Sequence, residues 1–331
     1  MFGTITGVLD RRFVVNALLP AVAFLGLVVA VPISRYGASV GLAWWNRQSG
    51  SAQAVLGAAF VLAALVLAYV LDAAGAFSLT VAQGRWGSRG PGRVLAQRAA
   101  AWHHRKAQRA ADDPELTPGR RDAMRLRYPP ASAADEFQAT TLGNVLHVAA
   151  RYPHTRYGIN AAIVWPRLYT VLPDSWAGTL GTIRSTLALH MTFATLLALL
   201  GPAAAVYLLL VGGQWWLVLA WYWGCAAAAW AAYRAALASA QLYATYTAVT
   251  FDAHRLQLRT KLGIDGPETP EQWAALARFW HRNIPLDAEV AEPPTATPRA
   301  SRGGRTLRPS TAWAVFTLLA GVAGALLAMS M

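Results

Sequence analysis

The amino-acid sequence predicts an all-α, polytopic membrane protein with about five transmembrane helices and helical extensions outside the bilayer. First, 55% of its 331 residues are apolar, which is too many for an ordinary soluble domain. Second, 14% of the residues are charged, which is too many for a chain that lies wholly within a membrane. Third, the apolar residues gather in long runs, and a helix of about 20 apolar residues crosses a bilayer.

Five apolar segments are long enough to form membrane-spanning helices. In chain order they are Phe13–Ile33, Gln53–Leu71, Ser185–Val211, Gln214–Tyr233 and Thr311–Met329. The third and fourth are joined by the short turn GGQ, so we expect them to be antiparallel neighbours. Basic residues precede the first segment as in a signal peptide. Its apolar region is too long for one, however, and no A-x-A cleavage site follows, so we expect a retained span.

Lysine and arginine residues predict the orientation of these spans. Of the 29, only Arg35 and Arg47 lie between the first two spans, and the other 27 lie before the first span or in the two long polar regions. Since positive residues favour the cytoplasmic side, we expect the N-terminus inside and the C-terminus outside. The formal net charge of +13 is then mostly a topology signal, so we expect no nucleic-acid partner. Arginine outnumbers lysine 27 to 2, which is typical of GC-rich genomes and favours a bacterial plasma membrane.

These segments divide the chain into six regions. They are a transmembrane hairpin (1–71), a basic helical cytoplasmic block (72–184), a second transmembrane hairpin (185–233), a cytoplasmic helical extension (234–285), a disordered linker (286–310) and a C-terminal transmembrane helix (311–331). The linker is rich in Pro, Ala, Thr, Arg and Gly and has no hydrophobic periodicity, which predicts disorder.

The first cytoplasmic block opens with a basic helix over residues 92–113, which is rich in Ala, Gln and Arg. Arg98, Arg105 and Arg109 share one face, and Trp102 lies on a narrow apolar stripe. Such a helix suits an anionic membrane surface. A solvated helix that packs on neighbouring protein is the alternative.

A connector, ARYPHTRYGINAAIVWPRLY at residues 150–169, leads towards the third span. We expect a helix with Thr140 or Thr141 as N-cap to end at Tyr152–Pro153, and a second break at Trp165–Pro166. The third span should then begin with Asp174 or Ser175 as N-cap. The connector is interpreted as a membrane elbow, as buried interdomain packing, or as a ligand site. Its candidate residues for a lipid, anion or interdomain clamp are Arg151, Tyr152, Arg156, Tyr157, Trp165 and Arg167.

The fourth span is predicted to continue as one helix from Trp215 to Leu262, because this stretch has no proline, and to end at Gly263. Asp252 lies between two apolar stripes of this helix, so we expect it to be partly buried. A buried carboxylate needs a cation. Arg255 is a local candidate, and the clamp hypothesis pairs Asp252 with Arg151, Arg156 or Arg167. A short amphipathic helix should follow, with Thr269 as N-cap and Pro270 at its first position.

Three motifs, LGNVL…ARYP…RYGINAAIVWPRL, FDAHRLQLRTKLG and TPEQWAAL, resemble a group of bacterial, largely actinobacterial, multi-span membrane proteins. The resemblance covers roughly residues 140–280. It implies the same multi-span architecture and carries no catalytic residue over. The order of hairpins and cytoplasmic helices is also similar to bestrophin-type anion channels, in topology only.

No motif for phosphate binding, zinc hydrolysis or a serine nucleophile is present, so we expect no enzyme, no catalytic residue, no cofactor and no metal. The single cysteine, Cys225, is expected to be buried. His190 is an intramembrane polar candidate. We expect a structural or interaction protein that binds anionic lipid or a cytoplasmic protein partner through its basic helices. The alternative is a homo-oligomeric channel or transporter with an anion pathway past Arg151, Arg156, Arg167 and Arg255.

Overall fold

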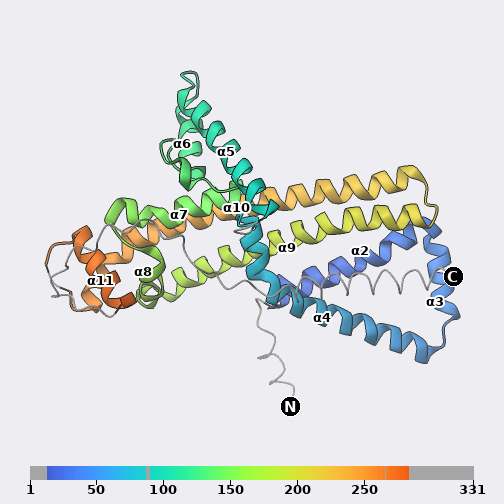
Figure 1. The fold of residues 1–331 in the computed structure, drawn as a ribbon. Coiled ribbons are helices and arrows are strands. Elements are labelled where there is room, and N and C mark those ends of the chain that lie inside the picture. Colours follow the sequence, from blue (N-terminus) through green and yellow to red (C-terminus); the bar gives the residue numbers. More distant parts are fainter. Residues whose placement is uncertain (1–12, 87–89, 265, 283–331) are drawn as a thin grey trace, which may run out of the picture. The chain divides into compact units, whose positions relative to one another are not determined.

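The computed structural model describes residues 13–86, 90–264 and 266–282, and 85% of this part is helical with no strand (Figure 1). The described chain forms two compact units. The first unit contains residues 13–82 and 184–239, and the second contains the rest. The regions predicted as two separate cytoplasmic blocks therefore fold together as one unit. The predicted linker 286–310 and the fifth apolar segment, Thr311–Met329, lie outside the described residues.

Three helical segments in the described chain are long and apolar enough to cross a membrane. They are Val14–Tyr36, Gly50–Gly75 and Asp174–Leu210. They coincide with the first three predicted spans, so the all-helical membrane class is confirmed to this extent. The expectation of about five spans is not confirmed, because the fourth segment belongs to a helix that is not among these three.

The first unit is built from a short π-helix and long α-helices. Its elements are η1 (Val14–Leu18), α2 (Leu19–Tyr36), α3 (Ala38–Arg47), α4 (Gly50–Ala82), α9 (Asp174–Leu210) from Arg184 on, and α10 (Trp215–Lys261) up to Ser239. Helix α3 was not predicted. It begins directly after Gly37, which separates it from α2. The positive φ of 92° at this residue suits glycine.

Small residues let the helices of the first unit approach closely. Ala17, Ala21 and Ala68 are buried between η1, α2 and α4, and Cys225 of α10 is buried in the same core, as predicted. A Cβ atom on Gly201 of α9 would lie 3.0 Å from the Cβ of Cys225. The predicted antiparallel hairpin of α9 and α10 is therefore closely packed around a glycine.

Polar contacts at both ends set the direction of α2 relative to α9. Ser185 Oγ, where α9 enters this unit, donates at 2.9 Å to Asn16 Oδ1 of η1, which leads into α2. Near their ends, Arg35 Nη2 donates to the carbonyl of Gly212, just after α9, at 3.3 Å. The two helices thus run in the same direction, as the predicted topology requires of its first and third spans.

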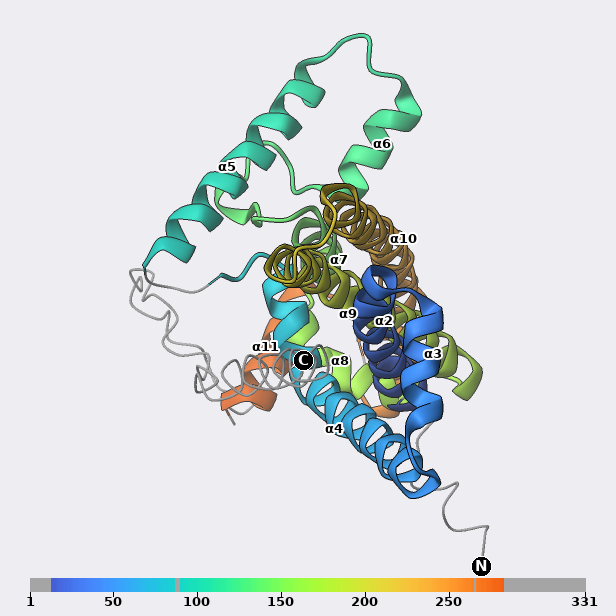
Figure 2. The ribbon, with the colours of Figure 1, turned by 90° about the vertical axis from the view of Figure 1, so that its right-hand side faces the viewer.

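The second unit consists of shorter helices and the ends of α9 and α10. Its elements are α5 (Pro91–Asp112), α6 (Pro118–Arg127), η2 (Ala134–Glu136), α7 (Thr141–Tyr157), α8 (Ala161–Leu168), η3 (Tyr169–Val171) and α11 (Pro270–Arg282). Figure 2 shows α5 and α6 as a hairpin of two helices. Ala107 of α5 packs with Tyr128 and Phe137 in a small core under this hairpin.

A buried asparagine holds the entry to α7. The side chain of Asn144 is fully buried, and its amide nitrogen donates to the carbonyls of Gln138 at 2.9 Å and Thr140 at 2.8 Å. Its Oδ1 accepts the Gln138 amide at 2.9 Å. These bonds satisfy the polar atoms of the buried amide and tie the residues before α7 to the start of the helix. Thr140 caps the helix by accepting the amide of Gly143 at 2.9 Å, as predicted.

Two predicted helix breaks are wrong. Helix α7 continues through Pro153 to Tyr157, and α8 contains Pro166. The Pro153 ring is buried, and its carbonyl accepts the amide of Ile159 at 3.1 Å across the left-handed Gly158, which closes α7 one turn later than predicted. The N-cap of α9 is also corrected, because Pro173 precedes the helix and its carbonyl accepts the amides of Trp176 and Ala177.

The C-terminal end of α10 and the start of α11 were predicted correctly. Helix α10 runs without interruption to Lys261, and Gly263 has a φ of 66° while Ile264 donates to the carbonyl of Arg259. Pro270 is the first residue of α11, and Thr269 Oγ1 accepts the amide of Gln272 at 3.3 Å. Glu268, which stands just before α11, thereby lies next to Arg255 of α10, where the candidate site is found.

Candidate functional site

The connector at residues 150–169 supplies the apolar side of a small core in the second unit. Ile159, Val164 and Leu168 are fully buried, together with Phe251 of α10 and Trp273 of α11. Trp165 packs half-buried against Phe251, with 5.7 Å between ring centroids. The apolar side of the connector is therefore buried packing, because it contacts α10 and α11.

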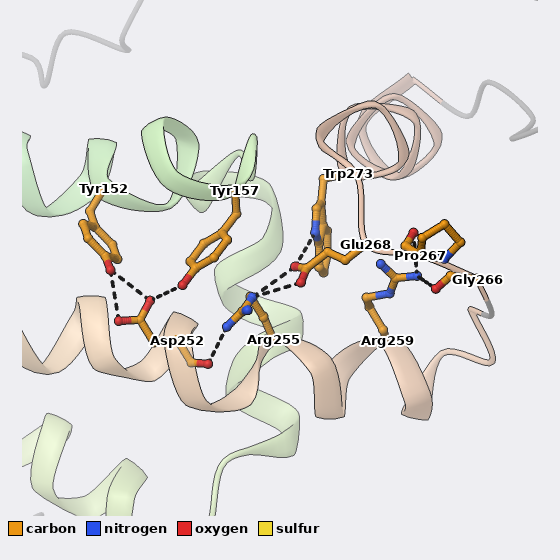
Figure 3. Close-up of polar contacts among 9 residues, drawn as sticks. All are labelled: Tyr152, Tyr157, Asp252, Arg255, Arg259, Gly266, Pro267, Glu268 and Trp273. Atoms are coloured by element: carbon orange, nitrogen blue, oxygen red, sulfur yellow. Dashed lines mark hydrogen bonds and ion pairs between the residues drawn. The ribbon is translucent and has the colours of Figure 1, made fainter.

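A polar cluster joins α7, α10 and α11, and we call it the latch. Its members are Tyr152, Tyr157, Asp252, Arg255, Glu268 and Trp273 (Figure 3). At its first end, two tyrosines of α7 bind one carboxylate of α10. Tyr152 donates its hydroxyl to both oxygens of Asp252 at 3.0 Å, and Tyr157 donates to Oδ1 at 2.7 Å.

At the other end of the latch, Glu268 binds two donors. Arg255 Nε lies 3.1 and 3.2 Å from the two carboxylate oxygens, and Trp273 Nε1 donates to Oε1 at 3.0 Å. The Arg255 guanidinium also lies 4.0 Å from the ring centroid of Tyr157 and donates to the carbonyl of Asp252. Arg255 thus links Glu268 to Tyr157, whose hydroxyl binds the Asp252 carboxylate, through hydrogen bonds and a cation–π contact.

The surroundings of the tyrosines disfavour their ionised forms. Burial is the largest cause, followed by the hydrogen bond to Asp252 and its negative charge, and together they raise the pKa of Tyr152 to about 12. Burial and the same carboxylate also raise the pKa of Tyr157. Both hydroxyls therefore remain protonated donors at neutral pH and are unsuited to act as bases.

The clamp hypothesis, which paired Asp252 with an arginine of the connector, is wrong. Asp252 does join the connector to α10, yet none of the ion pairs between described residues links it to Arg151, Arg156 or Arg167. Asp252 is also exposed, although partial burial was expected. An exposed carboxylate does not require a cation, so two tyrosine hydroxyls suffice.

The arginines of the connector bind elsewhere. Arg151 forms an ion pair with Glu136. Arg167 donates to the carbonyl of Ile163 at 2.8 Å, and its guanidinium lies 4.3 Å from the ring centroid of Trp280. Arg156 is exposed. The four arginines named for an anion pathway thus have different partners: Glu136 for Arg151, Trp280 for Arg167, and Tyr157 for Arg156 and Arg255.

Three residues at or beside the site, Glu268, Trp273 and Arg259, were not predicted from the sequence. Arg259 is buried and donates to the carbonyls of Gly266 at 2.8 Å and Pro267 at 3.4 Å. The spacing of Glu268 and Trp273 around the predicted cap at Thr269 was the available signal, since residues next to a helix start tend to contact one another.

His190 lies in the first unit and contacts one hydroxyl. Its Nδ1 is 3.3 Å from Ser239 Oγ, which also donates to the carbonyl of Ala235. Within the described chain, no group of three or more His, Cys, Asp or Glu residues could hold a metal ion. The adjacent His103 and His104 point to different contacts, Tyr128 and the carbonyl of Ala131.

Acidification is expected to loosen the packing of α5. Burial, and then the charge of Lys106, lower the pKa of His103, against a raising backbone hydrogen bond at Ala139. The unfolded chain therefore binds the proton more readily than the folded unit. The neutral His103 ring therefore stabilises the folded unit fully above the ordinary pKa of about 6.5. This stabilisation is lost as the pH falls below that value. Faster amide hydrogen exchange of α5 below this pH would be the measured result.

The control for this prediction is a pair of variants. His103→Phe keeps an aromatic ring against Tyr128 and should flatten the pH dependence of exchange in α5. His154→Gln, at an exposed position of α7, should leave that dependence as it is in the unmodified protein. An equal pH dependence in His103→Phe would show that another group controls α5. His147 is the first to test, because burial and the charge of Arg85 lower its pKa.

Comparisons with protein-family models, with curated proteins and with solved structures gave no match. In the latch, every donor described above binds an acceptor of the same unit. Its chemistry is that of a joint between helices.

Proposed function

We propose that this chain is an integral protein of a bacterial plasma membrane with a structural or interaction role, whose second unit lies in the cytoplasm and binds an anionic partner. One observation carries the proposal: the polar side chains of the latch bind one another, whereas the cations of the α5–α6 hairpin are turned to solvent. The exposed cations are Arg93, Arg98, Arg105, Lys106, Arg109, Arg120 and Arg125. The resemblance to an actinobacterial membrane group is part of the same proposal.

We include a fourth span, formed by the first part of α10. Trp215 and Trp216 stand at its start, and Trp230 stands about 22 Å further along, at 1.5 Å per residue. Tryptophan prefers the two membrane interfaces, although hydropathy averages score it as polar. Arg234 lies 5.5 Å from the ring centroid of Trp230, as expected for a basic residue at the cytoplasmic end. The fifth span, Thr311–Met329, is proposed from sequence alone.

Cysteine labelling tests the proposed topology. In a Cys225→Ala background, Gly50→Cys and Gly119→Cys each add one exposed thiol at a position where a Cβ atom meets no other atom within 4 Å. Intact cells treated with a membrane-impermeant maleimide should label Gly50→Cys and leave Gly119→Cys unlabelled. Both variants should react after the cells are opened.

The opposite labelling pattern would show that the chain has the reverse orientation. Labelling of both thiols in intact cells would place the second unit outside and contradict a cytoplasmic role. The Cys225→Ala protein without an added thiol is the control for background labelling, because Cys225 is the only cysteine in the chain.

A further inference from the structure

Helix α5 has two faces of different chemistry. His103 and Ala107 are buried against the core that contains Tyr128 and Phe137. The opposite face carries a series with helical spacing, which we call the outer stripe: Leu95, Arg98, Trp102, Arg105 and Arg109. Because the inner face anchors the helix to its own unit, the outer stripe is held in one orientation.

The outer stripe combines exposed apolar side chains with cations. Leu95 is 57% exposed and Trp102 is 53% exposed. Lys106 Nζ lies 5.3 Å from the ring centroid of Trp102, and an open depression is lined by Trp102, Arg105, Lys106 and Arg109. The stripe contains no acidic residue. Tryptophan, leucine and arginine on one helix face form the pattern of helices that lie in the interface of an anionic bilayer.

The chain itself keeps this stripe near a membrane if α4 crosses one. Helix α4 ends at Ala82 and α5 begins at Pro91, so at most about 30 Å of extended chain separates their ends. A tethered surface meets its ligand at a high effective concentration, so weak contacts suffice. The lipid surface is therefore favoured over an acidic protein, which would have to arrive by diffusion.

We propose that the outer stripe of α5 binds anionic lipid headgroups, with its arginines on the phosphates and with Leu95 and Trp102 in the headgroup region. This inference rests on the proposed membrane function and specifies its ligand. Each arginine near an anionic surface is expected to contribute about fivefold to the docking equilibrium. Loss of three should weaken docking by about 100-fold.

An environment-sensitive fluorophore on α5 tests the proposal in the full-length protein. In the Cys225→Ala background, the label is attached to Leu95→Cys or, as the matched control, to Gln97→Cys, an exposed site on another side of the same turn. The protein is incorporated into nanodiscs of phosphatidylcholine with or without phosphatidylglycerol. Only the Leu95 label should shift its emission to shorter wavelength, and only with phosphatidylglycerol. The shift should vanish in about 1 M salt, where the Debye length is about 3 Å.

The variant Arg98→Gln/Arg105→Gln/Arg109→Gln should abolish the shift while α5 stays folded, as amide hydrogen exchange of its inner face would show. An unchanged emission of the Leu95 label in phosphatidylglycerol nanodiscs would overturn the inference. A shift produced only by added polyglutamate would overturn it in favour of an acidic protein partner. Failure of the chain to enter nanodiscs at all would instead contradict the proposed membrane function.

Discussion

Replacing Gly158 with alanine is expected to destabilise the second unit by about 2–5 kcal/mol. Gly158 ends α7 with a φ of 72°, a conformation that costs other residues about 1–2 kcal/mol. An added Cβ atom would lie 2.6 Å from Pro270 Cβ and 2.9 Å from Pro270 Cα, and such overpacking costs about 1–3 kcal/mol more. Urea unfolding in detergent, monitored through hydrogen exchange of the α7 and α11 amides, measures the stability of this unit separately.

Gly263→Ala is the matched control for this prediction. Gly263 ends α10 with a nearly equal φ of 66°, yet a Cβ atom there would meet nothing within 4 Å. The Gly263→Ala variant should therefore lose only the conformational part of the unfolding free energy, about 1–2 kcal/mol. Equal losses for the two variants would show that Pro270 moves aside and that the contact between Gly158 and α11 is unimportant.

Replacing Glu268 with alanine is expected to separate α11 from α10. The change leaves Arg255 Nε and Trp273 Nε1 without their acceptor, and Trp273 is only 1% exposed. A buried donor without a partner costs about 1–3 kcal/mol, so we expect a loss of about 2–4 kcal/mol for the two. Faster hydrogen exchange should appear first in α11, because it contributes Trp273 and Leu276 to the shared core.

Two further variants make this prediction specific. Glu271→Ala removes an exposed carboxylate three residues further along and should cost less than about 1 kcal/mol. Glu268→Gln retains one acceptor oxygen, so it should recover part of the loss. If Glu268→Ala and Glu271→Ala behaved alike, the contacts of the latch would not stabilise the unit.

The sequence predicted local features of this fold well because they depend on neighbouring residues. The long α10, its end at Gly263 and the caps at Thr140 and Thr269 follow from propensity and from hydrogen bonds within a few residues. The first three apolar spans follow from composition in the same way. The proline breaks failed because tertiary packing of Pro153 and a cap at Gly158 outweighed a local preference.

The partners of Asp252 could not be predicted, because they depend on the rotation of α7 about its own axis. Arg151 and Tyr152 are about 100° apart on a helix, so a modest rotation exchanges one for the other. The burial of Leu142, Val145 and Ala149 sets this rotation and turns the tyrosines towards Asp252.

The sequence by itself determined an all-helical chain with long apolar segments and a basic, Trp-bearing helix, because these properties are local. Only the tertiary structure decided that the two polar regions form one unit, that the connector is buried packing, and that tyrosines and Glu268 form the latch. These depend on contacts between residues about 100 positions apart, such as Tyr152 with Asp252, and the geometry of such contacts is set by the packing of whole helices.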